Sequence, residues 1–252
     1  MFELTIAIIT NINQLSFDEA THIFSGLLTG LLLILVGFIT LSRNKNNRVN
    51  QAFLGFFSGL GLHFCLDSIL FIFQELPIES LNLLRDLSIL FLILGLSIGA
   101  LATIIIHYGE GSIINPRVLI PWTLGTIFIA FLGVINDSLK SGDHHADAHF
   151  EYNRSLLGWI GITGIAIVFT ILIVYNLLIL IRDSEKDFRL RLLKMISGFI
   201  LIIVLTVAFD TGSAIEILEV LTENLIIHLS MHLGIIFGSI LILNAFWTPL
   251  TE

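Results

Sequence analysis

The chain has 252 residues, of which 56% are hydrophobic and only 13% are charged, and its formal net charge is −8. The mean hydropathy is +0.96, whereas roughly a quarter of the residues in a soluble domain are charged. These values exclude an ordinary soluble enzyme or nucleic-acid-binding domain. They predict an integral membrane protein whose first partner is the lipid bilayer. The single cysteine, Cys65, excludes an internal disulfide.

Seven apolar segments are long enough to cross a bilayer about 30 Å thick as helices. They leave almost no residues for a soluble domain. The sequence therefore predicts an all-α fold, with one seven-helix membrane domain over residues 1–252 and one sizeable loop at residues 136–155. The segments in chain order are Glu19–Leu41, Gln51–Phe73, Leu81–His107, Val118–Ile135, Leu156–Ile181, Leu192–Phe209 and Leu221–Phe246.

Lysine and arginine are distributed unevenly between the two sides that these segments define. Nine of them fall in the first, third and fifth loops, and three fall on the other side. Because basic residues concentrate in cytoplasmic loops, we expect the N-terminus outside and the C-terminus in the cytoplasm, with the plasma (cytoplasmic) membrane as the location. The nine are Arg43, Lys45, Arg48, Arg117, Arg182, Lys186, Arg189, Arg191 and Lys194, and the three are Arg85, Lys140 and Arg154.

The second segment carries a histidine and an aspartate inside an apolar run, FFSGLGLHFCLDSILFIF. His63 and Asp67 are one turn apart and therefore share a helix face. Ionisable residues inside a membrane are costly and normally face the bundle interior at a working site. At about 1.5 Å per residue, Asp67 lies about 10 Å and His63 about 16 Å from the outer end of the segment.

The loop at residues 136–155 contains GDHHADAHFEY, a dense set of imidazole and carboxylate groups. Such groups bind zinc, nickel or copper. The alternative is a solvated loop that binds metal only weakly and without purpose. The possible ligands are Asp143, His144, His145, Asp147 and His149.

The seventh segment, NLIIHLSMHLGIIFG, places His228 and His232 one turn apart. They lie about 9 Å and 15 Å from the outer end, at the same depths as the pair in the second segment. If these two helices face one another, the imidazoles of His63, His228 and His232 converge with the carboxylate of Asp67. Three histidines with an acidic residue or water form a sensible zinc shell, in which a bound water becomes a nucleophile.

Hydrogen bonding offers a simpler interpretation of each of these histidines. A histidine within a membrane can be satisfied by a backbone carbonyl or by a hydroxyl. Ser58, Ser68 and Ser230 lie close in the sequence to the three histidines.

One histidine in the second helix and HxxxH in the seventh, on a seven-helix chain, resembles the CREST superfamily. That superfamily includes progestin/adiponectin receptor-like proteins, hemolysin III proteins and alkaline ceramidases. The resemblance implies zinc held by His63, His228 and His232, with Asp86 as the aspartate that supports the zinc-bound water. Ser58 is the nearest residue to the position of the family's assisting serine. The implied activity is hydrolysis of a lipid amide or ester within the bilayer.

Two other functions use the same residues. His63 with His228 or His232 could provide the axial ligands of haem b in an electron-transfer subunit of a larger membrane complex. Most acidic residues fall near the side that the topology predicts to be outside. Alternatively, therefore, the intramembrane ligands, the His/Asp loop and this acidic side could serve a non-enzymatic sensor or carrier of divalent metal ions or protons. Because no charged residues continue into the inner half, a one-sided site is favoured over a transport path.

Overall fold

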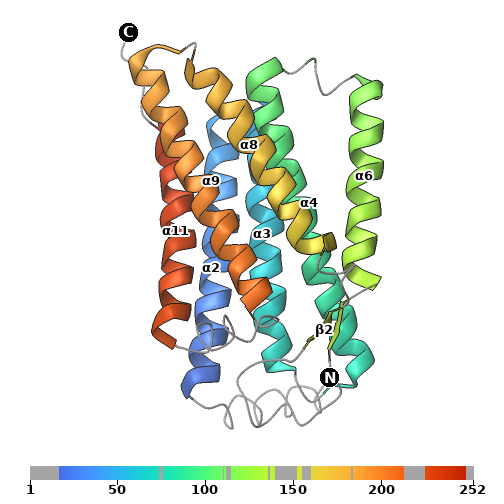
Figure 1. Ribbon diagram of the computed structural model, residues 1–252. Coiled ribbons are helices and arrows are strands. Elements are labelled where there is room, and N and C mark those ends of the chain that lie inside the picture. Colours follow the sequence, from blue (N-terminus) through green and yellow to red (C-terminus); the bar gives the residue numbers. More distant parts are fainter. Residues whose placement is uncertain are drawn as a thin grey trace.

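A computed structural model of the protein describes residues 17–73, 76–109, 111, 115–135, 137–139, 152–154, 160–182, 184–212 and 225–247. In this part of the chain, long helices stand side by side in a bundle, and two short strands lie at its lower end in Figure 1. The elements are α2 (Phe17–Arg43), α3 (Arg48–Ile72), α4 (Ile78–Tyr108), α6 (Pro116–Ile135), β1 (Asp137–Leu139), β2 (Tyr152–Arg154), the π-helical turn η1 (Ile160–Gly164), α8 (Ile165–Arg182), α9 (Lys186–Gly212) and α11 (Leu225–Trp247).

Six of the described helices are long and apolar enough to cross a membrane. They are α2, α3, α4, α8, α9 and α11. Only α6 contributes a shorter apolar stretch, Leu119–Leu132, and it stands at the edge of the bundle in Figure 1. The predicted bundle of long apolar helices is confirmed for the described residues, with one short pair of strands beside it, whereas the seventh crossing and the orientation stay predictions.

Local signals set the ends of the helices around the site. Asn47 begins α3 because its side-chain oxygen accepts hydrogen bonds from the backbone N–H groups of Val49 and Asn50. Pro77 precedes α4, where a missing N–H costs nothing. Gly109 ends α4 with a φ of 82°, which glycine adopts without a steric penalty.

Glycines allow the helices that carry the site to approach closely. A Cβ atom added to Gly59 of α3 would lie 2.6 Å from Cα of Gly95 on α4. One added to Gly30 of α2 would lie 2.5 Å from the carbonyl oxygen of Gly61 on α3. Helices in lipid have no hydrophobic force that brings them together, so they associate through close packing at small residues. These glycine contacts therefore hold α2, α3 and α4 in register.

Aromatic side chains fill the half of α3 nearer its beginning, at the upper end of the bundle. Phe53, Phe56 and Phe57 are fully buried and pack with Phe199 of α9. The ring centroids of Phe56 and Phe199 are 5.1 Å apart. The polar clusters described below therefore lie at one end of the bundle, beyond an apolar aromatic layer.

The predicted His/Asp loop is bounded by the two strands. β1 and β2 pair antiparallel, with Asp137 opposite Arg154. The five possible metal ligands between them, Asp143, His144, His145, Asp147 and His149, lie outside the described residues.

Candidate functional site

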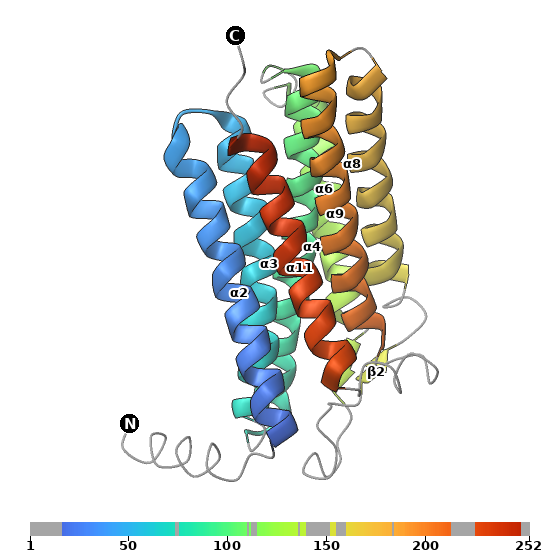
Figure 2. The same cartoon turned by 90° about the vertical axis from the view of Figure 1, so that its left-hand side faces the viewer.

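Two polar clusters lie near the lower end of the bundle, the end at which α2, α4 and α11 begin (Figures 1 and 2). We name them after the helices that build them. The α3–α4 cluster consists of His63, Asp67, Arg85 and Ser88, and the α2–α11 cluster consists of His22, Ser25, Thr29, His228 and His232.

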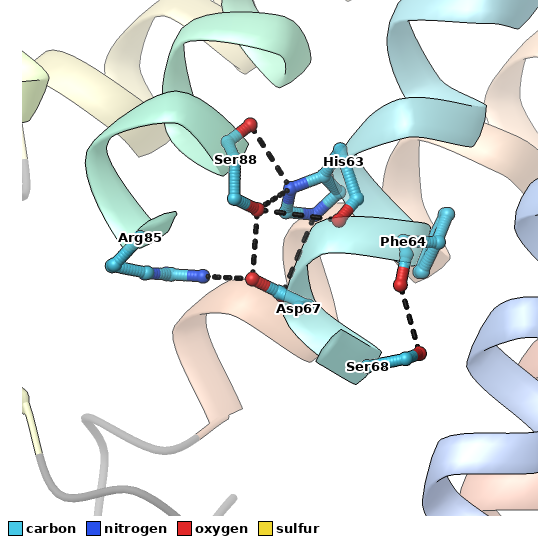
Figure 3. Close-up of polar contacts among 6 residues, drawn as sticks. All are labelled: His63, Phe64, Asp67, Ser68, Arg85 and Ser88. Atoms are coloured by element: carbon cyan, nitrogen blue, oxygen red, sulfur yellow. Dashed lines mark hydrogen bonds and ion pairs between the residues drawn. The ribbon is translucent and has the colours of Figure 1, made fainter. Parts of the chain in front are cut away.

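The α3–α4 cluster forms where one turn of each helix faces the other. His63 and Asp67 are four residues apart on α3, and Arg85 and Ser88 are three apart on α4. Each pair therefore shares a face of its helix. Figure 3 shows the four side chains directed toward one another across the helix interface.

Short hydrogen bonds join the four side chains of the α3–α4 cluster. Arg85 Nη1 donates to Asp67 Oδ1 at 2.8 Å, and Ser88 Oγ donates to the same oxygen at 2.7 Å. His63 Nδ1 lies 2.7 Å from Ser88 Oγ. His63 Nε2 lies 3.9 Å from Asp67 Oδ2. The cluster is thus a continuous chain from guanidinium to carboxylate to hydroxyl to imidazole.

Burial makes the Asp67–Arg85 ion pair a strong constraint on the packing of α3 against α4. Arg85 is 1% exposed, and the side chain of Asp67 is 30% exposed. A charge inside a membrane protein is tolerated when it is paired within the bundle. The guanidinium therefore has its counter-charge on the neighbouring helix, and the serine hydroxyl ties that counter-charge to His63.

The α2–α11 cluster brings three imidazoles together between two helices. The Nε2 atoms of His228 and His232 are 3.1 Å apart. The rings of His22 and His228 pack with centroids 3.5 Å apart. All three histidines are buried.

Hydroxyls from α2 complete this cluster. Thr29 Oγ1 lies 2.9 Å from His232 Nδ1. Ser25 Oγ lies 3.4 Å from His228 Nε2 and donates to the backbone carbonyl of His22 at 3.1 Å. His22, Ser25 and Thr29 are three and four residues apart, which places them along one face of α2.

Chemically, the His228–His232 pair can share either a proton or a metal ion. In a neutral pair, one Nε2 donates its hydrogen and the other accepts it. Zinc bonds to imidazole nitrogen at about 2.0–2.1 Å, so two ligands of a tetrahedral zinc ion lie about 3.3 Å apart. The observed separation of 3.1 Å is close to that value, and this pair fits two corners of a zinc shell.

One aromatic ring contacts a histidine of each cluster. The ring centroid of Phe64 lies 5.2 Å from that of His63 and 5.6 Å from that of His232. The structure therefore divides the predicted ligands between two neighbouring sites, with His63 and Asp67 in one and His228 and His232 in the other. Among the described residues, no group of three or more His, Cys, Asp or Glu is placed to hold a metal ion.

The two residues predicted to assist catalysis do not occupy the places beside His63. Ser58 is half-buried on α3, about 7.5 Å along the helix axis from His63 and on another face. Asp86 is half-buried on α4 and follows Arg85, so it points about 100° away around the helix. The hydroxyl and carboxylate beside His63 are those of Ser88 and Asp67. Roles for Ser58 and Asp86 stay predictions.

Sequence reasoning missed several members of the two clusters. Arg85 was counted only as a basic residue of the predicted outer side, and Ser88, Ser25 and Thr29 received no role. A signal existed, because each set has the spacing of one helix face. What the spacing does not provide is which helices are neighbours.

Comparisons of the chain with protein-family models, with curated proteins and with solved structures find no match. The resemblance to the CREST superfamily therefore stays a prediction that rests on three histidines and the helical architecture.

Proposed function

We propose that the protein binds a divalent transition-metal ion, zinc in the first instance, between the helices at the lower end of the bundle. We further propose that the site hydrolyses an amide or ester bond of a lipid. The observation that carries the metal proposal is the 3.1 Å separation of the buried Nε2 atoms of His228 and His232. When bound, zinc supplies Lewis acidity and a water that ionises near neutral pH.

His63 is the third ligand in this proposal, and its position sets a requirement. The ring of Phe64 packs against both His63 and His232, and we expect it to move when the two imidazoles share one ion. Asp67 and Ser88 are already bonded to one another beside His63 and hold its ring. Thr29 supports His232 in a similar way.

A lipid substrate agrees with the surroundings of the clusters. The helices that carry them expose large apolar side chains on their outer faces, including Phe24 and Leu28 of α2 and Ile226 of α11. Such faces are suited to lipid chains. A scissile bond near a lipid headgroup would enter at the level where α2 and α11 begin.

The experiment uses the purified protein in vesicles, with fluorescent lipids that contain either an amide or an ester bond. Hydrolysis is expected to stop after treatment with a chelator and to return when zinc is added. His232→Ala is expected to abolish hydrolysis. His107→Ala is the matched control, because His107 lies at the other end of α4 and its buried Nδ1 has no hydrogen-bond partner among the described residues. Hydrolysis that is insensitive to both chelation and His232→Ala refutes the proposal.

A metal sensor without enzymatic activity is the second candidate. The α2–α11 cluster joins two helices that are far apart in the sequence, so a bound metal would fix their relative position. The aromatic layer around Phe56 and Phe199 separates this end from the upper end, which favours sensing over transport. Metal binding with no hydrolysis of either lipid class would support this candidate.

Haem is less well supported by the arrangement. Phe64 contacts both His63 and His232, so a macrocycle between those two imidazoles would need the volume of that ring. His228 and His232 lie on the same face of one helix, which does not suit opposite axial ligands. An absorption spectrum of the purified protein is expected to lack a Soret band, and a Soret band lost in His232→Ala would overturn this assignment.

A further inference from the structure

We infer that Ser88, Asp67 and Arg85 are positioning residues that fix His63 as the tautomer with hydrogen on Nδ1. Nε2 is then the nitrogen that offers its lone pair to a ligand. The use of Nε2 for metal binding rests on the proposed function, but the assignment of the tautomer does not.

The argument begins at Arg85, whose guanidinium only donates hydrogen bonds and always carries its charge. It donates to Asp67 Oδ1 at 2.8 Å. Because the pair lies inside the bundle, the carboxylate form of Asp67 is the counter-charge that this guanidinium needs. Asp67 therefore acts as a hydrogen-bond acceptor toward its other neighbours.

Ser88 lies between Asp67 and His63, and the direction of its hydrogen bond determines the role of the histidine nitrogen. Its hydroxyl has a single hydrogen. Three possible acceptors surround it: Asp67 Oδ1 at 2.7 Å, the backbone carbonyl of His63 at 3.3 Å and His63 Nδ1 at 2.7 Å. A hydrogen directed at Nδ1 would leave Ser88 Oγ against the Asp67 carboxylate oxygen at 2.7 Å with no hydrogen between the two oxygens. The hydroxyl therefore donates to Asp67 and not to His63 Nδ1.

His63 Nδ1 must consequently be a donor. It faces Ser88 Oγ at 2.7 Å and the backbone carbonyl oxygen of Ser88 at 3.3 Å. A bare nitrogen lone pair at these distances would meet only oxygen lone pairs. Because Ser88 is 0% exposed and His63 1% exposed, a buried and unsatisfied contact of this kind would be costly.

His232 provides a contrast that sharpens the inference. Its Nδ1 lies 2.9 Å from Thr29 Oγ1, and its Nε2 lies 3.1 Å from His228 Nε2. Each of these neighbours can either donate or accept, so both tautomers of His232 satisfy the geometry. At His63, an ion pair orders the hydrogen bonds and leaves one tautomer.

The consequence for a metal site is pre-organisation. Histidines that bind a metal usually donate their second ring N–H to an oxygen, and removing that oxygen typically lowers metal affinity by about 10–100-fold. Ser88 supplies such an oxygen here, and the Asp67–Arg85 pair fixes the direction of its hydrogen bond.

The primary test is nuclear magnetic resonance of the metal-free, detergent-solubilised protein with ¹⁵N-labelled histidine. Long-range ¹H–¹⁵N correlations identify the ring nitrogen that carries hydrogen, and His63→Gln assigns the signals. The expected result for the wild-type protein is hydrogen on Nδ1 of His63. A wild-type signal with hydrogen on Nε2 overturns the inference, whether or not the protein binds metal.

Variants provide the second test. Ser88→Thr keeps the hydroxyl and is expected to keep the tautomer, whereas Ser88→Ala is expected to release it and to lower zinc affinity by about 10–100-fold. Ser97→Ala is the control on the same helix, because Ser97 bonds to Thr126 and Trp122 instead. Equal zinc affinity in Ser88→Ala and wild type refutes the positioning role. Absence of zinc together with the Nδ1 tautomer refutes only the proposed function.

Discussion

The Asp67–Arg85 ion pair allows a quantitative test of the packing between α3 and α4. Asp67→Asn and Arg85→Met each remove one charge with little change in side-chain size. Asp67→Asn removes the carboxylate that Arg85 Nη1 contacts at 2.8 Å, and the arginine is only 1% exposed. Breaking a buried ion pair by removing one partner typically costs about 3–5 kcal/mol.

The coupling between the two residues follows from their geometry. The N–O contact is 2.8 Å, and two charges centred about 4 Å apart interact by about 4 kcal/mol at an effective dielectric constant near 20. The side chain of Asp67 is 30% exposed, so solvent screening reduces this value, and we expect a coupling of about 2 kcal/mol. The double variant should therefore lose about 2 kcal/mol less stability than the sum of the losses in the two single variants.

The assay is equilibrium unfolding in mixed detergent micelles, followed by helical circular dichroism, for the wild type and all three variants. The two single variants should unfold at lower denaturant fractions, and the double variant should recover part of the loss. A coupling below about 0.5 kcal/mol would refute the buried ion pair, because independent sites agree with additivity to within that amount.

Four further outcomes are expected. Gly59→Ala should lower the free energy of unfolding by about 1–3 kcal/mol, because its Cβ would meet the backbone of α4 at 2.6 Å. Gly125→Ala, which meets nothing within 4 Å, should change it by less than about 0.5 kcal/mol in the same unfolding assay. Phe64→Leu should raise zinc affinity about tenfold in equilibrium dialysis if moving its ring costs about 1.4 kcal/mol. Unchanged affinity would refute the expectation that this ring moves when His63 and His232 share one ion. Thr29→Val should lower zinc affinity about tenfold by removing the oxygen beside His232, and equal affinities would count against that contact.

Helix existence was predictable because long apolar runs have few other solutions in a bilayer. Helix ends were less predictable, since polar residues extend several helices beyond their apolar runs. α3 begins at Arg48 because Asn47 caps it, and α9 begins at Lys186, six residues before its predicted start. Arg48 and Lys186 are not apolar, so the hydropathy pattern did not include them in the predicted helices.

Pairs within one helix were also predictable. The one-turn spacing of His228 and His232, and of His63 and Asp67, follows directly from helix geometry. Contacts between helices were not predictable, because the spacing of residues identifies one face of a helix but not the helix that packs against that face. The contact between His22 of α2 and His228 of α11 is an example. Phe64 could not be recognised as the ring that contacts both clusters, since it is one of 20 phenylalanines in the chain.

The central claim is that His228 and His232 form part of a metal site. Its most direct test is the zinc content of protein purified after zinc reconstitution and removal of free metal, compared among wild type, His228→Ala, His232→Ala and the His107→Ala control. We predict about one zinc ion per chain in the wild type and the control, and almost none in the other two variants. Equal zinc content in all four proteins, or none in the wild type, would contradict the account.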